Sequence, residues 1–257
     1  MSSEDQSRRT EFHLRLGVGD DELLATVRVP TAPIRPVDLL PLLQPLDDAI
    51  VDAAVQRVRR QGKMVSCRAG CGACCRQLVP IGHTEAHHLA GLVGSLPAGR
   101  RTHLLRRFQE AIETLDAHGL LDRLRAAPRL ADADAQGRLA RDYFAVQLAC
   151  PFLEDESCSI YPDRPLSCRE YLVTSPAAYC RDPESNRVEK VSLNAKPTQV
   201  LFRFDDGEGK GDLCWLPLVL SLQWVAAQGP AKQPRLPGHG MFQSFLERLA
   251  EQGKPSP

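Results

Sequence analysis

The sequence predicts a mainly α fold with a small β element, an α+β chain that is interrupted by an irregular, cysteine-rich segment. Three observations support this prediction. Apolar residues recur at helical spacing over much of the chain, alternation typical of strands is confined to short stretches, and nine cysteines fall mostly where periodicity is absent. The apolar fraction of 43% and the charged fraction of 25% are those of a globular protein, so a wholly disordered chain is excluded.

Two short extended runs stand near the start of the chain. Phe12, Leu14 and Leu16 alternate with polar residues, and Leu24 to Val29 form the second run. Between them, Gly17 to Asp21 supply the glycine and aspartate that turns favour. This pattern predicts a β-hairpin.

Helical spacing follows the proline-rich connector Pro30 to Pro36. The apolar positions that recur on one face are Leu46, Ile50, Ala54, Val55 and Val58. They predict a helix that ends before Gly62 and leads into the first group of cysteines. Residues 1–62 are therefore expected to form an N-terminal unit of hairpin and helix.

Three further helices are predicted between the two groups of cysteines. One is capped by Thr84 and runs to Val93, Pro97 opens the next, and the third includes Leu139 to Val146. They form a helical insertion in a cysteine-cluster domain that we expect at residues 63–182.

The C-terminal part, residues 183–257, is predicted to be a mostly helical extension. Val188 to Phe204 has mixed, β-like character, after which helical spacing returns at Trp215 to Val225 and at Phe242 to Leu249. The glycines and prolines between Gly229 and Gly240 indicate an exposed connector.

Charge and hydropathy exclude two classes of partner. Lys and Arg total 32, Asp and Glu total 32, and the sequence pI is near 7.0, so no net charge attracts a nucleic acid or an acidic membrane. The most apolar stretch, Leu213 to Ala227, is interrupted by Pro217 and Gln223 and is shorter than the roughly 20 residues that a membrane-spanning helix needs. We expect it to be a core helix.

The cysteines indicate the compartment. The N-terminal residues carry charges where an export signal needs an apolar core, so we expect a cytoplasmic protein. Thiols stay reduced there, and a cysteine framework then indicates metal or redox chemistry more often than structural disulfides. The odd number, nine, also leaves one thiol outside any full pairing.

The first group of cysteines places four thiols within nine residues. These are the thiols of Cys67, Cys71, Cys74 and Cys75. Gly70 and Gly72 permit tight turns and leave backbone N–H groups free to face thiolates. Because thiolates held this close repel one another, a bound cation would stabilise them. A redox dithiol, or inert cysteines on one face of a helix, are the alternatives, and the two glycines argue against the helix.

The second group is more widely spaced. Its thiols are those of Cys150, Cys158, Cys168 and Cys180. Pro162 and Pro165 fix the chain on either side of Asp163 and Arg164, and a proline in a first helical turn suits a short helix that carries Cys168. A thiolate near such a helix N-terminus is favoured by the helix dipole.

Five arginines accompany the two groups. Four thiolates around one divalent ion keep a formal charge of about −2, and guanidinium groups can offset this charge and donate to sulfur. We expect Arg164 and Arg169 beside a bound metal or cluster, with ordinary surface arginines as the alternative. Arg68, Arg76 and Arg181 add positive charge nearby.

The two segments together, CRAGCGACC and CPFLEDESCSIYPDRPLSCREY, strongly resemble the YkgJ-type cysteine-cluster family, a bacterial zinc- or iron-chelating domain. The family pattern is a C-x(2–3)-C-x2-C-C start and a later C-x-I-Y-x2-R-P-x2-C-R segment. Cys71, Cys74 and Cys75 match the core of the start, and Cys67 matches its variable first position. The residues that match the later segment are Cys150, Cys158, Ile160, Tyr161, Arg164, Pro165, Cys168 and Arg169, and Cys180 fits a later cysteine of the family.

The resemblance covers Cys67 to Cys180 and implies that the eight cysteines of the two groups chelate zinc or iron. A flagellin lysine N-methylase carries a similar cluster, so the resemblance also implies an alternative, a metal-dependent enzyme such as a protein lysine methyltransferase. A thiol redox protein is a further alternative. The expected partner is a metal ion, and the sequence identifies no protein partner.

The spacing bears on the metal. A structural zinc site usually draws its ligands from two close cysteine pairs, whereas single cysteines at intervals of about ten residues joined to one tight loop suit an iron–sulfur cluster. Two four-cysteine mononuclear sites, one cluster with spare ligands, and a polynuclear site all remain open. Cys67, Cys71 and Cys74 also have the spacing of radical S-adenosylmethionine enzymes, but consecutive helices follow them in place of alternating strands and helices.

Other chemistries lack their motifs. The sequence has no phosphate-binding glycine loop, nucleophile-elbow serine or HExxH motif, so we predict no catalytic residue. His83, His87 and His88 form a cluster that we interpret as the solvated end of a helix, with metal binding or acid–base chemistry as the alternative. Cys214 lies outside the family pattern and is expected to be a core thiol.

Overall fold

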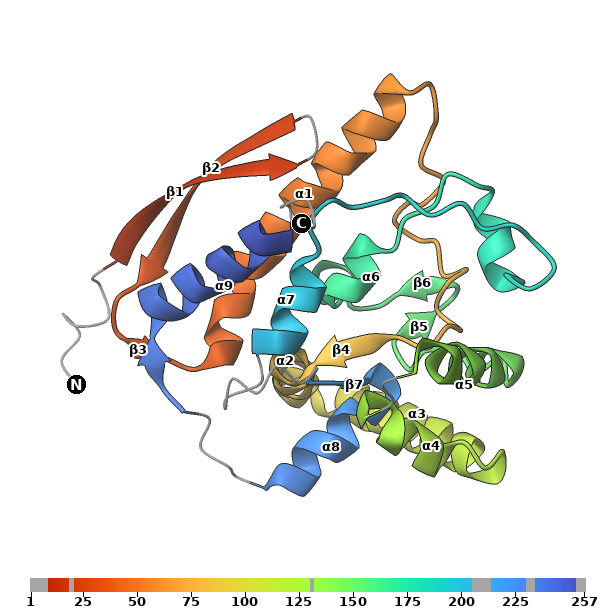
Figure 1. Ribbon diagram of the computed structural model, residues 1–257. Coiled ribbons are helices and arrows are strands. Elements are labelled where there is room, and N and C mark those ends of the chain that lie inside the picture. Colours follow the sequence, from red (N-terminus) through yellow and green to blue (C-terminus); the bar gives the residue numbers. More distant parts are fainter. Residues whose placement is uncertain (1–8, 19–20, 130–131, 205–213, 230–233, 253–257) are drawn as a thin grey trace.

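The computed structural model describes residues 9–18, 21–129, 132–204, 214–229 and 234–252. Residues 19–20 of the predicted turn, Leu213, and part of the predicted connector between Gly229 and Gly240 lie outside these ranges. Within them the chain is mainly helical with small antiparallel sheets, which confirms the predicted fold class. Figure 1 shows β1, β2, α1 and α9 on one side of the molecule and α3, α4, α5 and α8 on the other, with α6 and short strands between them.

The N-terminal hairpin and helix form as predicted. Strand β1, Arg9–Val18, pairs antiparallel with β2, Asp21–Pro30, and the hairpin packs on α1, Leu40–Arg60. Leu14 and Val29 are buried in this contact. The long apolar face of α1 therefore has the hairpin as one of its partners.

A first apolar cluster joins the two ends of the described chain. It contains residues of the hairpin, of α1, of α7, Pro197–Phe204, and of α9, Gly238–Gln252. Its fully buried side chains include Leu39, Leu40, Leu43, Ile50, Leu166, Phe242 and Phe245. The β-like interpretation of Val188 to Phe204 is wrong for residues 197–204, because Pro197 suits a first helical turn and the apolar residues after it cover one helical face. Val188 to Lys190 contributes an isolated bridge, between Val173 and Lys190.

A second apolar cluster holds the helical insertion. Its helices are α2, His83–Ser95, α3, Ala98–Ala117, α4, Leu121–Ala126, and α5, Ala133–Ala145. A 3-10 turn at Ala127–Arg129 follows α4, a helix of six residues that is too short to show periodicity in the sequence.

The cluster is closed by a segment from the C-terminal part. Strand β7, Trp215–Pro217, pairs with β4, Pro80–Gly82, and a 3-10 turn at Leu218–Leu220 leads into α8, Ser221–Gln228. The prediction of a continuous core helix from Leu213 to Ala227 is therefore wrong for the residues before α8, which begins at Ser221. Pro217 has no N–H to donate within a helix, and the residues before it form strand bonds with β4.

Helix α2 begins at a different cap from the one predicted. Gly82 is the N-cap, and the Gly82 N–H donates to Glu85 Oε2 at 2.9 Å. Thr84, the predicted cap, is buried. Pro97 stands at the N-cap of α3, next to the helix start that it was expected to mark.

The cysteine-rich segment contributes to both clusters, since Phe152 and Ile160 belong to the second and Leu166 to the first. It contains strands β5, Leu153–Glu154, and β6, Ser157–Cys158, a 3-10 turn at Tyr161–Asp163, helix α6, Leu166–Glu170, and a 3-10 turn at Ala177–Arg181. A last small pair joins β3, Pro33–Ile34, to β8, Leu236–Pro237. In the described ranges, no helix has the length and apolar character needed to cross a membrane.

Candidate metal centre

The first group of cysteines lies on a chain of tight turns. Cys71 N–H donates to the Arg68 carbonyl at 3.1 Å, and Cys75 N–H donates to the Gly72 carbonyl at 3.0 Å. Gly70 has φ +83°, a left-handed conformation that favours glycine. The helical alternative for Cys67 to Cys75 is excluded by this conformation.

Gly72 is the point of closest approach to the second group. A Cβ atom at this position would lie 2.5 Å from the Glu156 carbonyl oxygen and would overlap Leu153 Cδ1. Leu153 lies on β5 and Glu156 in the turn between β5 and β6, so a residue without a side chain is required for the two segments to meet.

The second group is carried by short elements. Cys158 lies on β6, opposite Leu153 of β5, and the turn between the strands has positive φ at Asp155 and Glu156. Cys168 lies on α6, which confirms the predicted short helix, and Cys180 lies in the 3-10 turn Ala177–Arg181.

Backbone bonds join the two groups directly. Cys150 N–H donates to the Cys75 carbonyl at 2.7 Å, and Val173 N–H donates to Cys67 Sγ at 3.4 Å. Ser66 N–H donates to the Val173 carbonyl at 2.9 Å. Two groups that are about 80 residues apart in the sequence therefore form one local structure.

The buried thiols are held in their protonated form. Burial raises the pKa of Cys150 to about 12 and that of Cys180 to about 11. Burial also raises the pKa of Cys67, of Cys158 and, by a large amount, of Cys168. For Cys74, a hydrogen bond with the Cys75 side chain, followed by burial, raises the pKa far above its usual range.

Cys74 packs, together with Cys67 and Cys71, against the buried Cys180 of the second group. A negative charge on Cys74 would raise the pKa of five other thiols, which belong to Cys67, Cys150, Cys158, Cys168 and Cys180. Thiols of both groups therefore lie within electrostatic reach of one side chain.

Residues 66–193 match the family model CxxCxxCC, described as "Putative zinc- or iron-chelating domain". The chain belongs to this family through that domain. The CxxCxxCC domain begins one residue before Cys67, contains all eight cysteines of the two groups and leaves Cys214 outside. No curated protein and no solved structure gives a significant match to the chain.

The donor set of the CxxCxxCC domain suits zinc or iron, since both metals bind thiolate sulfur. In the described ranges, however, no group of three or more His, Cys, Asp or Glu side chains has the arrangement of metal ligands. None of the nine cysteines, all of which lie in the described ranges, forms a disulfide. The thiols are thus gathered but not closed around one point, and metal binding requires their side chains to turn toward one another.

The arginines of the CxxCxxCC domain take different positions. Arg164 stacks on the Tyr161 ring, 4.0 Å from its centroid, and its positive charge acts to lower the pKa of Cys67, Cys74 and Cys158. Its Nε is buried without a hydrogen-bond acceptor. Arg164 therefore has the position predicted for a donor to thiolate.

Arg169 binds a carboxylate and two backbone carbonyls. Its side chain is 6% exposed, and its donors reach the Asp48 carboxylate at 2.7 Å and the carbonyls of Pro162 and Arg164. These bonds fasten the turn before α6 to α1. Arg76 and Arg181 both pair with Glu156, at 2.7 and 3.0 Å. The first ion pair ties the first group to the β5–β6 turn, and the second ties the Ala177–Arg181 turn to it.

One buried carboxylate positions Cys168 and was not predicted. Glu85 is 3% exposed, and its Oε1 accepts the Leu166 N–H at 2.8 Å while Oε2 accepts Gly82 N–H. It thereby links the start of α2 to the start of α6. The sequence signal was the Glu three residues after the N-cap, which identifies a capping box but not the second acceptor bond.

The remaining predicted residues lie elsewhere. Cys214 is half-buried, and its N–H donates to the Phe202 carbonyl at 2.8 Å. The interpretation of the histidines as a solvated helix end is wrong, because all three are half-buried and the rings of His83 and His87 contact Trp224 at centroid distances of 4.3 and 5.6 Å. Burial lowers the pKa of His83 to about 4, so its ring is neutral at pH 7.

Proposed function

We propose that this protein binds zinc or iron in a reducing compartment, through thiolates of its CxxCxxCC domain. The proposed ligands are drawn from Cys67, Cys71, Cys74, Cys75, Cys150, Cys158, Cys168 and Cys180. The observation that carries the proposal is the packing of thiols from both segments against one another, with Cys67, Cys71 and Cys74 against the buried Cys180.

The raised pKa values explain why a cation is needed. Buried thiols stay protonated at pH 7 and cannot act as anions together, whereas a bound cation displaces their protons and offsets the repulsion between the thiolates. The zinc or iron would supply this charge. Arg164 is proposed to donate its free, buried Nε–H to a ligating sulfur.

For the form of the metal, we favour an iron–sulfur cluster over a structural zinc ion. The second group supplies single cysteines on separate short elements, β6, α6 and a 3-10 turn, in place of a second close pair. Separate elements can hold ligands around a cluster that is larger than one ion.

The test is anaerobic purification followed by elemental analysis and an absorption spectrum. Iron with acid-labile sulfide and visible absorption supports the cluster, and colourless protein with zinc supports the mononuclear form. Cys214→Ser is the matched control for Cys168→Ser, because both remove one thiol but only Cys168 lies in the domain. Metal-free protein from the anaerobic preparation contradicts the proposal.

A thiol redox protein is the second candidate, and the hydrogen bond between the Cys74 and Cys75 side chains favours it. Reversible loss of two thiols on mild oxidation of the metal-free protein would support this candidate. An enzyme such as a lysine methyltransferase has no such support from the described residues.

A further inference from the structure

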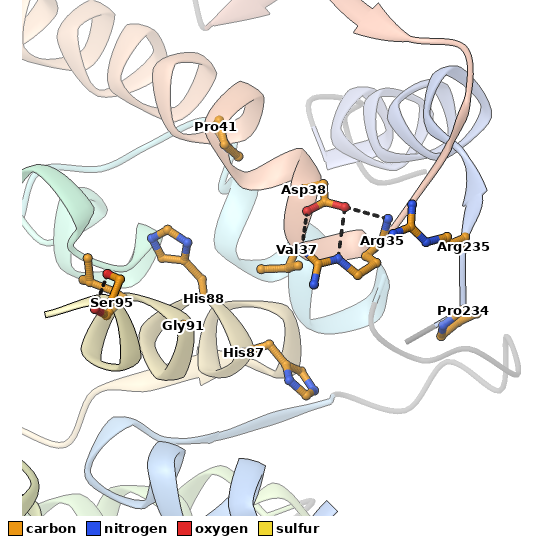
Figure 2. A pocket seen from close by; sticks show the side chains of 11 residues that line it. Arg35, Val37, Asp38, Pro41, His87, His88, Gly91, Ser95, Pro234 and Arg235 are labelled. Atoms are coloured by element: carbon orange, nitrogen blue, oxygen red, sulfur yellow. Dashed lines mark hydrogen bonds and ion pairs between the residues drawn. The ribbon is translucent and has the colours of Figure 1, made fainter. Parts of the chain in front are cut away.

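A large pocket outside the cysteine region lies between α2 and the segment that precedes α1. Its volume is about 1000 Å³, and its walls come from residues 35–41, from α2, and from residues 234–235. Figure 2 shows Arg35 and Asp38 on one wall, His87 and His88 on α2, and Arg235 on the third segment. No cysteine of the described ranges lines it.

Two arginines meet at this pocket because of the short β3–β8 pair. Pro33 pairs with Pro237 and Ile34 with Leu236, so the antiparallel register brings Arg35 and Arg235 to opposite positions just beyond the pair. Like charges placed opposite each other repel, and a negative partner stabilises them. Residues that are 200 apart in the sequence thus bring two guanidinium groups to one wall.

One of the two charges is already neutralised. Arg35 Nη2 donates to Asp38 Oδ1 at 2.7 Å, and its Nε and backbone N–H donate to Oδ2. Asp38 is the carboxylate among the described lining residues. Because both of its oxygens accept bonds from Arg35, it is a poor ligand for a cation. Arg235 has a weaker tie, since its Nη1 lies 3.5 Å from the Pro33 carbonyl. One positive charge remains in excess.

The helix wall adds the imidazole rings of His87 and His88 and apolar surface. His88 turns toward Asp163, with Nε2 3.6 Å from Oδ1, while His87 is influenced by Arg35. Burial first, and then the Arg35 charge, hold the pKa of His87 below its usual value, so it is a neutral hydrogen-bonding group at pH 7. Val37 and Leu92 supply apolar wall.

We propose that this pocket binds a small organic anion, with its phosphate or carboxylate group held by Arg235 and its apolar body extending along Val37 and Leu92 toward His87 on α2. A pocket with apolar walls and a few convergent polar groups is the usual form of a small-molecule site. The excess positive charge selects an oxyanion over a neutral or cationic ligand.

The probes are phenyl phosphate and benzoate, with benzyl alcohol as the neutral control of similar size, measured by ligand-detected NMR and calorimetry on the purified full chain. At least one anion binds at millimolar concentration, and benzyl alcohol binds at least roughly tenfold more weakly. The stronger of the two anions identifies the oxyanion class. Absence of binding by both anions, or equal binding of benzyl alcohol, overturns the proposal.

Two substitutions with matched controls locate the binding. Arg235→Gln raises the dissociation constant of the anion roughly five- to tenfold, whereas Arg138→Gln, on α5 outside the pocket, leaves it unchanged. Gly91→Leu places an apolar side chain in the part of the pocket that the α2 wall lines and weakens binding, because a Cβ at Gly91 meets open space and the glycine lines the pocket.

Gly94→Leu is the control for Gly91→Leu, since Gly94 is on the same helix, also faces open space and does not line the pocket. Neither leucine variant lowers Tm, which separates blocked binding from misfolding. Binding equal to that of the unaltered protein in both Arg235→Gln and Gly91→Leu overturns the proposal. Metal content is measured in parallel and is expected to stay constant, so failure here leaves the metal proposal unaffected.

Discussion

Replacing Gly72 by Ala tests whether the close approach of the two cysteine segments is needed for metal binding. The added Cβ would lie 2.5 Å from the Glu156 carbonyl oxygen, which is backbone and cannot turn away, and would overlap Leu153 Cδ1. The β5–β6 turn must therefore move away from the first group. Overpacking of this kind costs about 1–3 kcal/mol, which corresponds to a fall in Tm of roughly 2–12 °C for a chain of this size.

The assay combines thermal unfolding with metal content after anaerobic purification. Movement of the β5–β6 turn carries Cys158 with it, so we expect both lower Tm and less bound metal in Gly72→Ala. Gly99→Ala is the matched control, because a Cβ at Gly99 meets nothing within 4 Å in the first turn of α3. Unchanged Tm and full metal content in Gly72→Ala would refute the reasoning.

Three further predictions follow from the site and from the buried carboxylates. Cys168→Ser loses bound metal and lowers Tm, because metal binding and ordering of the loop share one free energy, while Cys214→Ser keeps its metal. Glu85→Gln turns one acceptor into a donor opposite a backbone N–H, so it lowers the free energy of unfolding by about 1–3 kcal/mol and reduces metal content; equal stability in urea titrations would contradict this. Burial, and next the Glu170 charge, raise the pKa of the Asp47 carboxyl in the folded protein to about 9. The folded state therefore holds this proton more tightly than the unfolded state, and the resulting stabilisation is full below about pH 4 and is lost as pH rises toward 9. Asp47→Asn therefore flattens the fall in stability between pH 5 and 9, and an unchanged slope would exclude Asp47 as its source.

The sequence was informative where one element carries its own pattern. The apolar residues of α1, the alternation of the hairpin and the proline before the Cys168 helix each indicate local structure without reference to another part of the chain. The eight cysteines likewise mark the extent of the CxxCxxCC domain. Helix α7 was missed because it has only eight residues and contains the β-branched Thr198 and Val200, which favour strands.

The contacts that build the site could not be predicted in this way. The ion pair of Arg76 with Glu156 and the bond of Glu85 to Leu166 N–H each join residues about 80 apart, and no local pattern selects those partners. The positions of the arginines could not be predicted for the same reason. Arg164 and Arg169 are five residues apart, yet one lies beside thiols and the other is directed to Asp48 of α1.

The second cysteine group shows how a segment without periodicity is held in place. Each of three cysteines has a buried apolar residue two positions away: Phe152 after Cys150, Ile160 after Cys158 and Leu166 before Cys168.

Phe152 and Ile160 enter the cluster of the helical insertion, whereas Leu166 enters the cluster formed by the two ends of the chain. Because turns separate these three residues, their burial produces no helical or strand period in the sequence. The two apolar clusters on either side therefore fix the backbone beside each thiol. Metal binding then has to reorient side chains of a loop that is already anchored, which costs less conformational entropy than folding a free loop.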